Sequence, residues 1–182
     1  QSPVTSLEGG NPLVEMAELI LNEVSRSVQA EGWHFNIEYC YPFTPATSAA
    51  GTKVIEIPDN VLALDTNPNS ADQVSIRGGF LYNRTDHTFV FDKKQELDVI
   101  WLESFDDIPE VFRYYITVRA ANVFAGRSVG SAEAVRFGER EEILARASAM
   151  EYETQQGDYS ILADRGNGTT YKSYLPIQTL YR

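Results

Sequence analysis

The sequence predicts an α+β fold: a helical bundle body with an inserted small antiparallel β domain and an extended C-terminal tail. Apolar residues recur at helical spacing at the start of the chain and again after residue 109, while period-two patterns with turn residues fill the middle third. Past residue 157 the chain is apolar but has no period. We therefore expect a helical body of residues 1–32 and 104–157, an inserted β domain of residues 33–103 and a docking tail of residues 158–182.

The first helix is predicted to run from Pro12 to about Glu31. Asn11 is a favoured N-cap residue, and proline is favoured at the first helical position. The apolar residues that share one face of this helix are Leu13, Ala17, Ile20, Val24 and Val28. Gly32 is expected to end the helix, because glycine is preferred just beyond a helix C-terminus.

Short strands are predicted throughout the middle third. The alternation of Trp33, Phe35 and Ile37 begins directly after the helix and is typical of a strand. The expected strands are Trp33–Tyr39, Val54–Ile57, Val61–Leu64, Val74–Arg77, Phe80–Asn83, Thr88–Phe91 and Leu97–Leu102.

Turn and loop residues separate these strands. Gly78-Gly79 suits a tight hairpin turn with positive φ, and a second turn over residues 83–86 makes residues 73–91 a small predicted meander. Residues 44–52 and 65–72 are rich in Pro, Ser, Ala, Asn and Gly. This composition favours mobile surface loops at one end of the β domain.

Two further helices are predicted after the β domain. One begins at Pro109 and extends to Gly126, and the next begins near Ser131 and extends to about Gln155, with Gly138 weakening or bending it. The apolar positions are Phe112, Ile116, Ala120, Val123 and Phe124 in the first helix, and Ile143, Leu144, Ala147 and Met150 in the second.

Composition narrows the classes of function. The net charge of −11 opposes binding to nucleic acid along the outside of the chain. No apolar run approaches the roughly 20 residues that span a bilayer, and no signal pattern opens the chain, so neither membrane insertion nor secretion is expected. The single Cys40 cannot form an internal disulfide, and with only His34 and His87 it cannot build a soft-ligand zinc site. We expect no metal, no cofactor and a cytoplasmic assembly compartment.

No catalytic constellation emerges from the sequence. Asp106-Asp107, with acids nearby, precedes Pro109, where a helix N-terminus favours negative charge. Neither histidine has a partner acid at useful spacing, and Cys40 has no nearby histidine on its predicted face. Aromatic residues of the helix after residue 109 match either sugar stacking or a core or subunit seam, and their helical spacing favours the second: Phe112, Tyr114, Tyr115 and Phe124. We therefore expect no enzyme.

Two groups of residues are predicted to bind partners. Basic and aromatic residues on the helix after residue 109 oppose acids on the next helix, so we expect them to set the register of neighbouring protomers: Arg113, Tyr114, Arg119, Arg127, Glu139, Glu141 and Glu142. The tail after Asp164 contains basic residues, no acidic residue, and several tyrosine and aliphatic residues, a composition suited to docking. The predicted docking residues are Arg165, Tyr171, Lys172, Tyr174, Leu175, Ile177, Leu180, Tyr181 and Arg182.

Four segments occur together in an order and spacing that resemble the tail tubular protein A family of short-tailed bacteriophages. They are Gly32–Ile37, Arg77–Thr85, Ile108–Ile116, and the run from Phe124 through Arg127 and Gly130 to Val135. The resemblance extends from Pro3–Gly9 to Met150–Glu153. No single segment is diagnostic, but the colinear set is.

The resemblance implies a tail adaptor or gatekeeper. Such a protein forms a twelve-fold ring between the portal protein and the tail nozzle protein, tail tubular protein B, with a channel through which genomic DNA passes without sequence-specific binding. It also implies a place in the virion tail, assembly in the host bacterial cytoplasm, and a further helix ahead of Pro3. Some relatives are credited with polysaccharide hydrolysis, which needs two carboxyl groups about 5 to 9.5 Å apart. The sequence singles out no such pair, so hydrolysis stays the alternative.

Overall fold

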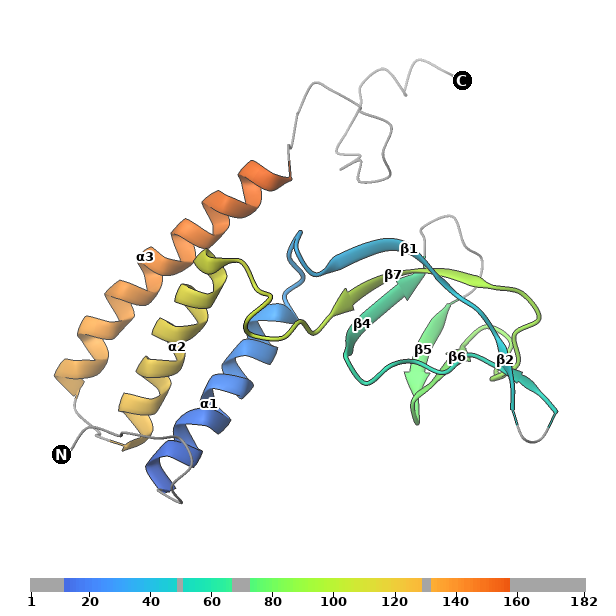
Figure 1. The fold of residues 1–182 in the computed structure, drawn as a ribbon, viewed down its shortest axis with the longest axis horizontal. Helices are drawn as coiled ribbons and strands as arrows, with labels where there is room; N and C mark the ends of the chain where they lie inside the picture. The colour runs from blue at the N-terminus through green and yellow to red at the C-terminus, as the bar shows by residue number, and fades with distance from the viewer. Residues whose placement is uncertain (1–11, 49–50, 67–72, 129–131, 158–182) are drawn as a thin grey trace, which may run out of the picture.

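The computed structural model describes residues 12–48, 51–66, 73–128 and 132–157. Helices gather at one end of the molecule and strands at the other (Figure 1). The helices are α1 (Pro12–Gln29), α2 (Glu110–Ser128) and α3 (Ala132–Gln156). The strands are β1 (Ile37–Phe43), β2 (Ala46–Thr47), β3 (Lys53–Val54), β4 (Val61–Thr66), β5 (Val74–Arg77), β6 (Phe80–Asn83) and β7 (Gln95–Trp101). The predicted α+β class, with small antiparallel sheets, is confirmed.

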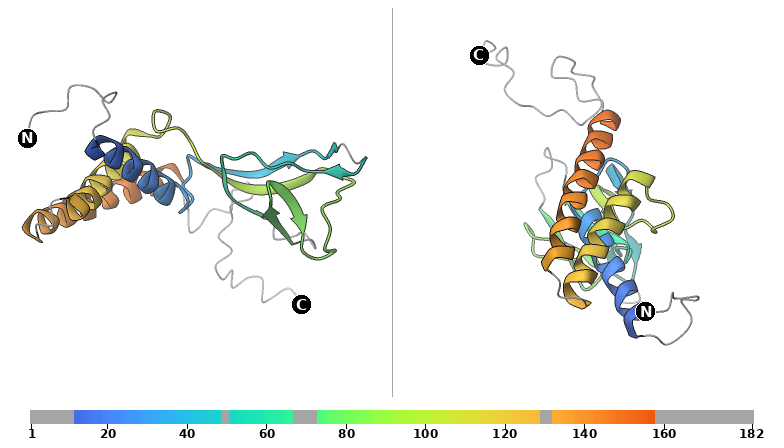
Figure 2. Two further views of the ribbon diagram at one scale, coloured as in Figure 1. Left: turned by 90° about the horizontal axis from the view of Figure 1, so that it is seen from below. Right: turned by 90° about the vertical axis from the view of Figure 1, so that its left-hand side faces the viewer.

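The three helices lie side by side with α2 in the middle, and α1 and α3 run in the same direction (Figures 1 and 2). Their shared core takes Ile20, Val24 and Val28 from the apolar face of α1. From α2 it takes large residues, whereas α3 contributes the small Ala145 and Ala149, both almost fully buried. Because alanine has a short side chain, α3 can approach α2 closely at these two positions, and nearer its C-terminal end the ring of Tyr152 packs on Phe112 with centroids 6.0 Å apart.

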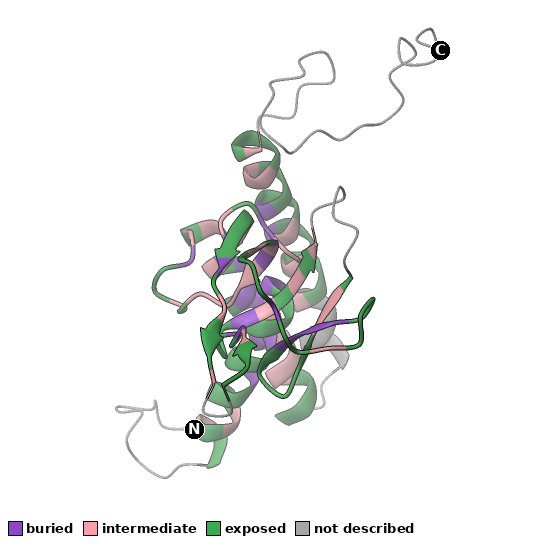
Figure 3. Ribbon diagram, turned by 90° about the vertical axis from the view of Figure 1, so that its right-hand side faces the viewer, coloured by how far each residue is buried: buried purple, intermediate pink, exposed green. Residues whose placement is uncertain are grey.

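The β module has a core of its own. The strand order β1-β7-β4 forms an antiparallel sheet, and β5 and β6 form a hairpin. The buried apolar residues of this core are Phe43, Ile55, Ile57, Val61, Leu81, Phe91, Leu97 and Val99. Coloured by burial and seen end-on, the ribbon shows most buried segments near the centre of the view and exposed segments around them (Figure 3). The chain therefore consists of two separate cores joined through short connections.

Glycine positions in the β module and at its start match the predicted turns. Gly78 and Gly79 have φ values of 59° and 80°, which confirms the tight turn between β5 and β6. Gly32 follows α1 with φ of 77°, and a Cβ there would lie 2.9 Å from Cδ1 of Ile100. Since only glycine adopts this backbone region without cost and leaves this space, Gly32 lets β7 approach the end of α1.

The predicted strand Trp33–Tyr39 is wrong in its first half, because β1 begins at Ile37. The backbone N–H of Asn36 donates to the carbonyl of Trp33 at 3.0 Å, which closes a turn. The rings of Trp33 and Phe35 both contact Phe112 of α2, each with centroids 4.8 Å apart from it. The alternation therefore came from two residues of a turn that pack on one ring of the helical core.

Other sequence predictions are also wrong in the β module. The expected strand Val54–Ile57 overlaps β3 only at Val54, where β3 ends. Thr88–Phe91 is not a strand, since Thr88 forms only an isolated bridge with Asn83. Residues 44–52 are not a plain loop, because β2 lies within them and pairs with β3. Of residues 65–72, the first two end β4 and the others lie outside the described residues. The β2–β3 pairing involves only two residues of each strand, which is too short to leave a period in the sequence.

Candidate functional site

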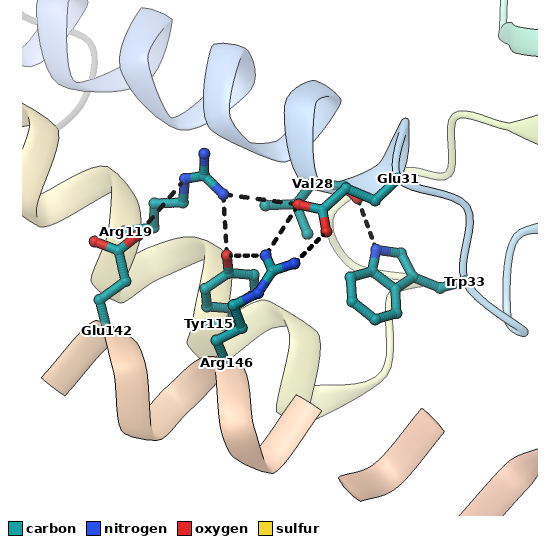
Figure 4. Close-up of polar contacts among 7 residues, drawn as sticks. All are labelled: Val28, Glu31, Trp33, Tyr115, Arg119, Glu142 and Arg146. Carbon is teal, nitrogen blue, oxygen red and sulfur yellow. Dashed lines mark hydrogen bonds and ion pairs between the residues drawn. The ribbon is translucent and has the colours of Figure 1, made fainter. Parts of the chain in front are cut away.

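A cluster of charged residues joins the three helices (Figure 4). Arg146 of α3 donates from Nη2 to Oε2 of Glu31 at 2.7 Å and from Nη1 to Oε1 at 3.1 Å. The same Nη1 donates to the hydroxyl of Tyr115 at 2.8 Å. The hydrogen bonds to Glu31, and then the one to Tyr115, raise the pKa of Arg146 above its usual range. This arginine therefore ties the end of α1 to both other helices.

Arg119 of α2 enters the same cluster from the other side. Its Nη1 donates to the hydroxyl of Tyr115 at 3.0 Å and lies 3.8 Å from Oε1 of Glu31. Its Nε lies 3.8 Å from Oε1 of Glu142 on α3. Tyr115 is 1% exposed, so its hydroxyl, which has two lone pairs, is the buried point at which two arginines meet.

Most residues predicted to bind neighbouring protomers have partners within their own chain. The hydroxyl of Tyr114 donates to Oε1 of Glu141 at 3.0 Å, and this bond raises the pKa of Tyr114. Asn122 donates to Glu142 at 3.0 Å, and Arg113 pairs with Glu110. These contacts hold α2 to α3 or support α2 itself. Whether the same side chains also contact a neighbour stays a prediction.

The remaining predicted residues differ from one another. Arg127 donates from Nη1 to Oε2 of Glu23 at 3.0 Å, which joins the far end of α2 to α1. This hydrogen bond, and then the charge of Arg127, lowers the pKa of Glu23. Glu139 is exposed and makes no ion pair among the described residues. The nine predicted tail residues from Arg165 to Arg182 lie outside the described part of the chain.

Two buried amides, which the sequence did not single out, fix the junction between the helical body and the β module. Gln29 is 0% exposed, donates to the carbonyl of Glu103 at 3.1 Å and accepts from the N–H of Glu103 at 2.8 Å. Asn36 is 1% exposed and donates to the carbonyls of Gln29 at 3.0 Å and Trp101 at 2.8 Å. Its Oδ1 accepts from the N–H of Trp33 at 2.8 Å. The Gln29 side chain therefore connects the end of α1 to the backbone at Glu103, and the Asn36 side chain binds backbone on both sides of the junction.

A second layer of contacts supports this junction from α3 and α1. The backbone N–H of His34 donates to both carboxylate oxygens of Glu153 at 3.0 and 3.1 Å. The indole Nε1 of Trp33 donates to the carbonyl of Val28 at 2.7 Å. In the sequence, two amide residues lie on either side of the glycine that ends the first helix. Isolated polar residues follow no periodic pattern, so their structural role was not predicted.

A cleft of about 380 Å³ lies in the β module and is lined by Ser48, Val54, Arg77, Gly78, Phe80 and Phe89, with no carboxylate among them. Within the described ranges, no three metal-ligating side chains come together in a group that could hold an ion. No described helix is long and apolar enough to cross a bilayer. The described side chains mainly connect elements of the fold. Ion pairs and hydrogen bonds join the three helices, and buried hydrogen bonds join the helical body to the β module.

Comparison with known families matches residues 1–159 to the tail tubular protein family. The chain belongs to this family. The match spans α1, the β module, α2 and α3, which are all the elements of the structure. The protein is accordingly a structural component of a phage tail and part of the virion. No curated protein matches the chain.

Proposed function

We propose that this tail protein is the adaptor between the portal protein and the tail nozzle protein, tail tubular protein B. In this proposal several copies, twelve in the family that the sequence resembles, form a closed ring around a channel for genomic DNA. Residues 1–32 and 104–157 form the ring-building body, and residues 33–103 are the β domain that extends from it. The chain is assembled into the virion tail in the host cytoplasm.

The observation that carries the proposal is the rigid junction between two separate cores. The buried side-chain amides of Gln29 and Asn36 make five hydrogen bonds to backbone groups at this junction, and these bonds favour one orientation of the two parts. An adaptor has to present two different surfaces to two different partners at a fixed separation. A chain whose two parts moved freely would transmit no fixed geometry from one partner to the other.

Charge supports the DNA channel. The chain carries a net charge of −11, and DNA is also negative. A ring of such subunits repels the passing DNA, so strand movement is not slowed by binding to phosphates. The channel in this proposal is therefore a passage without sequence recognition.

The tail of residues 158–182 is proposed as a docking segment. Three bases and no acid follow Asp164, so the net charge of −11 divides into −14 up to Asp164 and +3 after it. A basic segment with several aromatic and aliphatic residues suits an acidic partner surface with apolar pockets. We propose the portal, or an adjacent subunit seated on it, as that surface.

Binding to purified portal tests the function. The full chain should co-sediment with portal rings, and negative-stain images should show an added ring on the portal. Deletion after Asp164 should weaken this binding while the circular dichroism melt stays unchanged. A full chain that never binds portal or nozzle would contradict the proposal. Glycan release that a single Asp or Glu substitution abolishes would favour the hydrolase alternative instead.

A further inference from the structure

The outward face of α3 carries exposed apolar residues. Ile143, Leu144 and Met150 are 68%, 63% and 46% exposed, and Ala147 is also exposed. The helix uses Ala145 and Ala149 for its contact with the rest of the body. An apolar face of this kind on a charged protein marks a surface that another structure covers.

Charged residues on α3 stand at defined intervals from this apolar face. Arg140 precedes Leu144 by four residues, and Glu151 follows it by seven. Intervals of four and seven keep residues on one side of a helix, so these three residues form a stripe, which we name the α3 stripe. All three are exposed.

The outward side of α1 has the same arrangement with the charges reversed. Leu19, at 70%, is the most exposed of the large apolar residues of the described chain. Glu15 precedes it by four residues and Arg26 follows it by seven, and both are exposed. We name Glu15, Leu19 and Arg26 the α1 stripe. Its order is acid, leucine, base, whereas the order of the α3 stripe is base, leucine, acid.

The charged residues of the two stripes make no ion pair within the described part of the subunit. Among the described residues, none of Glu15, Arg26, Arg140 and Glu151 forms an ion pair. Elsewhere on the helical body, by contrast, charges such as Arg119, Arg127 and Arg146 meet acids of other elements. The four charges that flank the two exposed leucines are therefore available to a neighbouring copy.

The arrangement of the helices lets the two stripes meet between copies. In the row of three helices, α2 lies between α1 and α3, and α1 and α3 run in the same direction (Figures 1 and 2). A ring forms when one face of each subunit binds a different face of the next. Rotation about a ring axis places the α3 edge of one copy beside the α1 edge of the next, with the directions of the two helices kept.

Parallel contact aligns all three positions. Leu144 then meets Leu19, Arg140 meets Glu15 and Glu151 meets Arg26 of the next copy. The two charge pairs are separated by 11 residues, which is about 16 Å along each helix. Antiparallel contact would place Arg140 near Arg26 and Glu151 near Glu15, so the charges also select the direction.

We propose that the α3 stripe of one copy binds the α1 stripe of the next and forms the seam of the ring, an inference that rests on the proposed function. The leucines and the other apolar residues of α3 exclude water, and the flanking charges set the register. Since each copy offers one stripe of each kind, the contact repeats around the ring without a free edge.

Charge reversal and restoration test the seam. Arg140→Glu and Glu15→Arg each place like charges opposite one another, so each should raise the concentration needed for assembly by about tenfold. The double variant restores opposite charges at every seam and should assemble close to the original concentration. Lys93→Glu, an exposed reversal in the β module, is the matched control and should change nothing. Light scattering gives the mass, and a circular dichroism melt shows that each variant is folded.

Engineered cysteines give a second, independent measurement. In a Cys40→Ser background, Leu19→Cys with Leu144→Cys should form a ladder of cross-linked chains on mild oxidation, whereas Val90→Cys with Leu144→Cys should not. A wild-type ring whose assembly is indifferent to the reversals, and whose stripe cysteines do not cross-link, overturns the seam and leaves the adaptor function standing. A wild-type chain that stays monomeric even with portal present overturns the adaptor function itself.

Discussion

The side-chain amide of Asn36 donates to the backbone carbonyl of Gln29 at 3.0 Å, and the amide of Gln29 in turn bonds both backbone groups of Glu103. These two residues, seven apart in sequence, connect the end of α1 with the chain that leaves β7. Both are almost fully buried. A buried amide has few ways to satisfy its hydrogen bonds, so the pair holds the junction in one geometry.

Asn36→Ala should therefore loosen the junction. The substitution removes the Asn36 partner of the Trp101 carbonyl and of the Trp33 N–H, and a buried unsatisfied group costs about 1 to 3 kcal/mol. The carbonyl of Gln29 also loses Asn36 but still accepts from the N–H of Gly32 at 3.1 Å. We expect a loss of about 2 to 4 kcal/mol in the free energy of unfolding, measured in urea. Asn60→Ala, an exposed control in a turn, should change it by less than about 0.5 kcal/mol. Equal losses of stability in the two variants would show that the hydrogen bonds of the Asn36 amide make no specific contribution to folding.

Tyr115→Phe should weaken the charged cluster of the helical body. The substitution removes the hydroxyl that accepts hydrogen bonds from Arg119 and Arg146 but keeps the buried ring. Both arginines remain partly solvated, so we expect a loss of about 1 to 2 kcal/mol in the free energy of unfolding. Tyr114→Phe is the matched control, because its hydroxyl is exposed and bonds only Glu141 in the described structure. A larger effect at Tyr114 than at Tyr115 would contradict this assignment.

Gly138→Ala should not give the stabilisation expected of an alanine in a helix. Alanine is favoured over glycine by about 1 kcal/mol in a helix interior. At this position an added Cβ would clash with Oδ1 of Asn122, whose Nδ2 donates to Glu142. The variant should be no more stable than wild type by thermal melting. Gly126→Ala on α2 meets open space and should raise the melting temperature. Stabilisation by both variants would show that Asn122 moves aside without cost.

The pair of Glu23 and Arg127 should give a measurable pH dependence. The hydrogen bond from Arg127 lowers the folded-state pKa of Glu23 below its ordinary value of 4.5. The contribution of the pair to stability is therefore present above that pH and is lost as the pH falls through the lower folded-state pKa. NMR titration of the Glu23 side chain should show the lowered pKa, and Arg127→Gln should bring it back toward 4.5. An unchanged pKa in that variant would mean that the contact does not persist in solution.

The sequence predicted the helices and the turns with the strongest local chemistry. Asn11-Pro12 and Pro109 marked helix starts within a residue or two, Gly32 marked the end of α1, and Gly78-Gly79 marked the hairpin turn. Each of these relies on backbone preferences of single residues, which need no knowledge of distant contacts. The class of the fold followed from the order of these elements.

Features that depend on distant contacts were not predicted. Trp33 looked like the start of a strand because its alternation with Phe35 is a local pattern, whereas its burial against Phe112 is decided by α2. Gln29 and Asn36 belong to no periodic pattern, and their partners Glu103 and Trp101 lie 74 and 65 residues away, respectively. Gly138 looked like a defect in a helix, but it makes room for Asn122. Tertiary packing overrode or completed the local signal in each case.

The residues predicted to bind partners were also predictable only in part from the sequence. Opposite charges on the two helices after the β module were visible in the sequence, and the structure brings Tyr114 and Arg119 to the acids of α3. That these contacts lie within one chain could not be predicted, because spacing along a helix does not tell whether the facing helix belongs to the same subunit. The exposure of Leu19 and Leu144, which carries the proposed seam, is known only from the packed structure.

An electron cryo-microscopy map of the purified protein assembled with portal is the most direct test of the proposed adaptor function. If the chain is the adaptor, the map shows a closed ring on the portal with one subunit per repeat. In that ring, α3 of each copy lies beside α1 of the next, and an open channel runs along the axis. A map in which the chain binds as separate monomers, or not at all, would contradict the adaptor function.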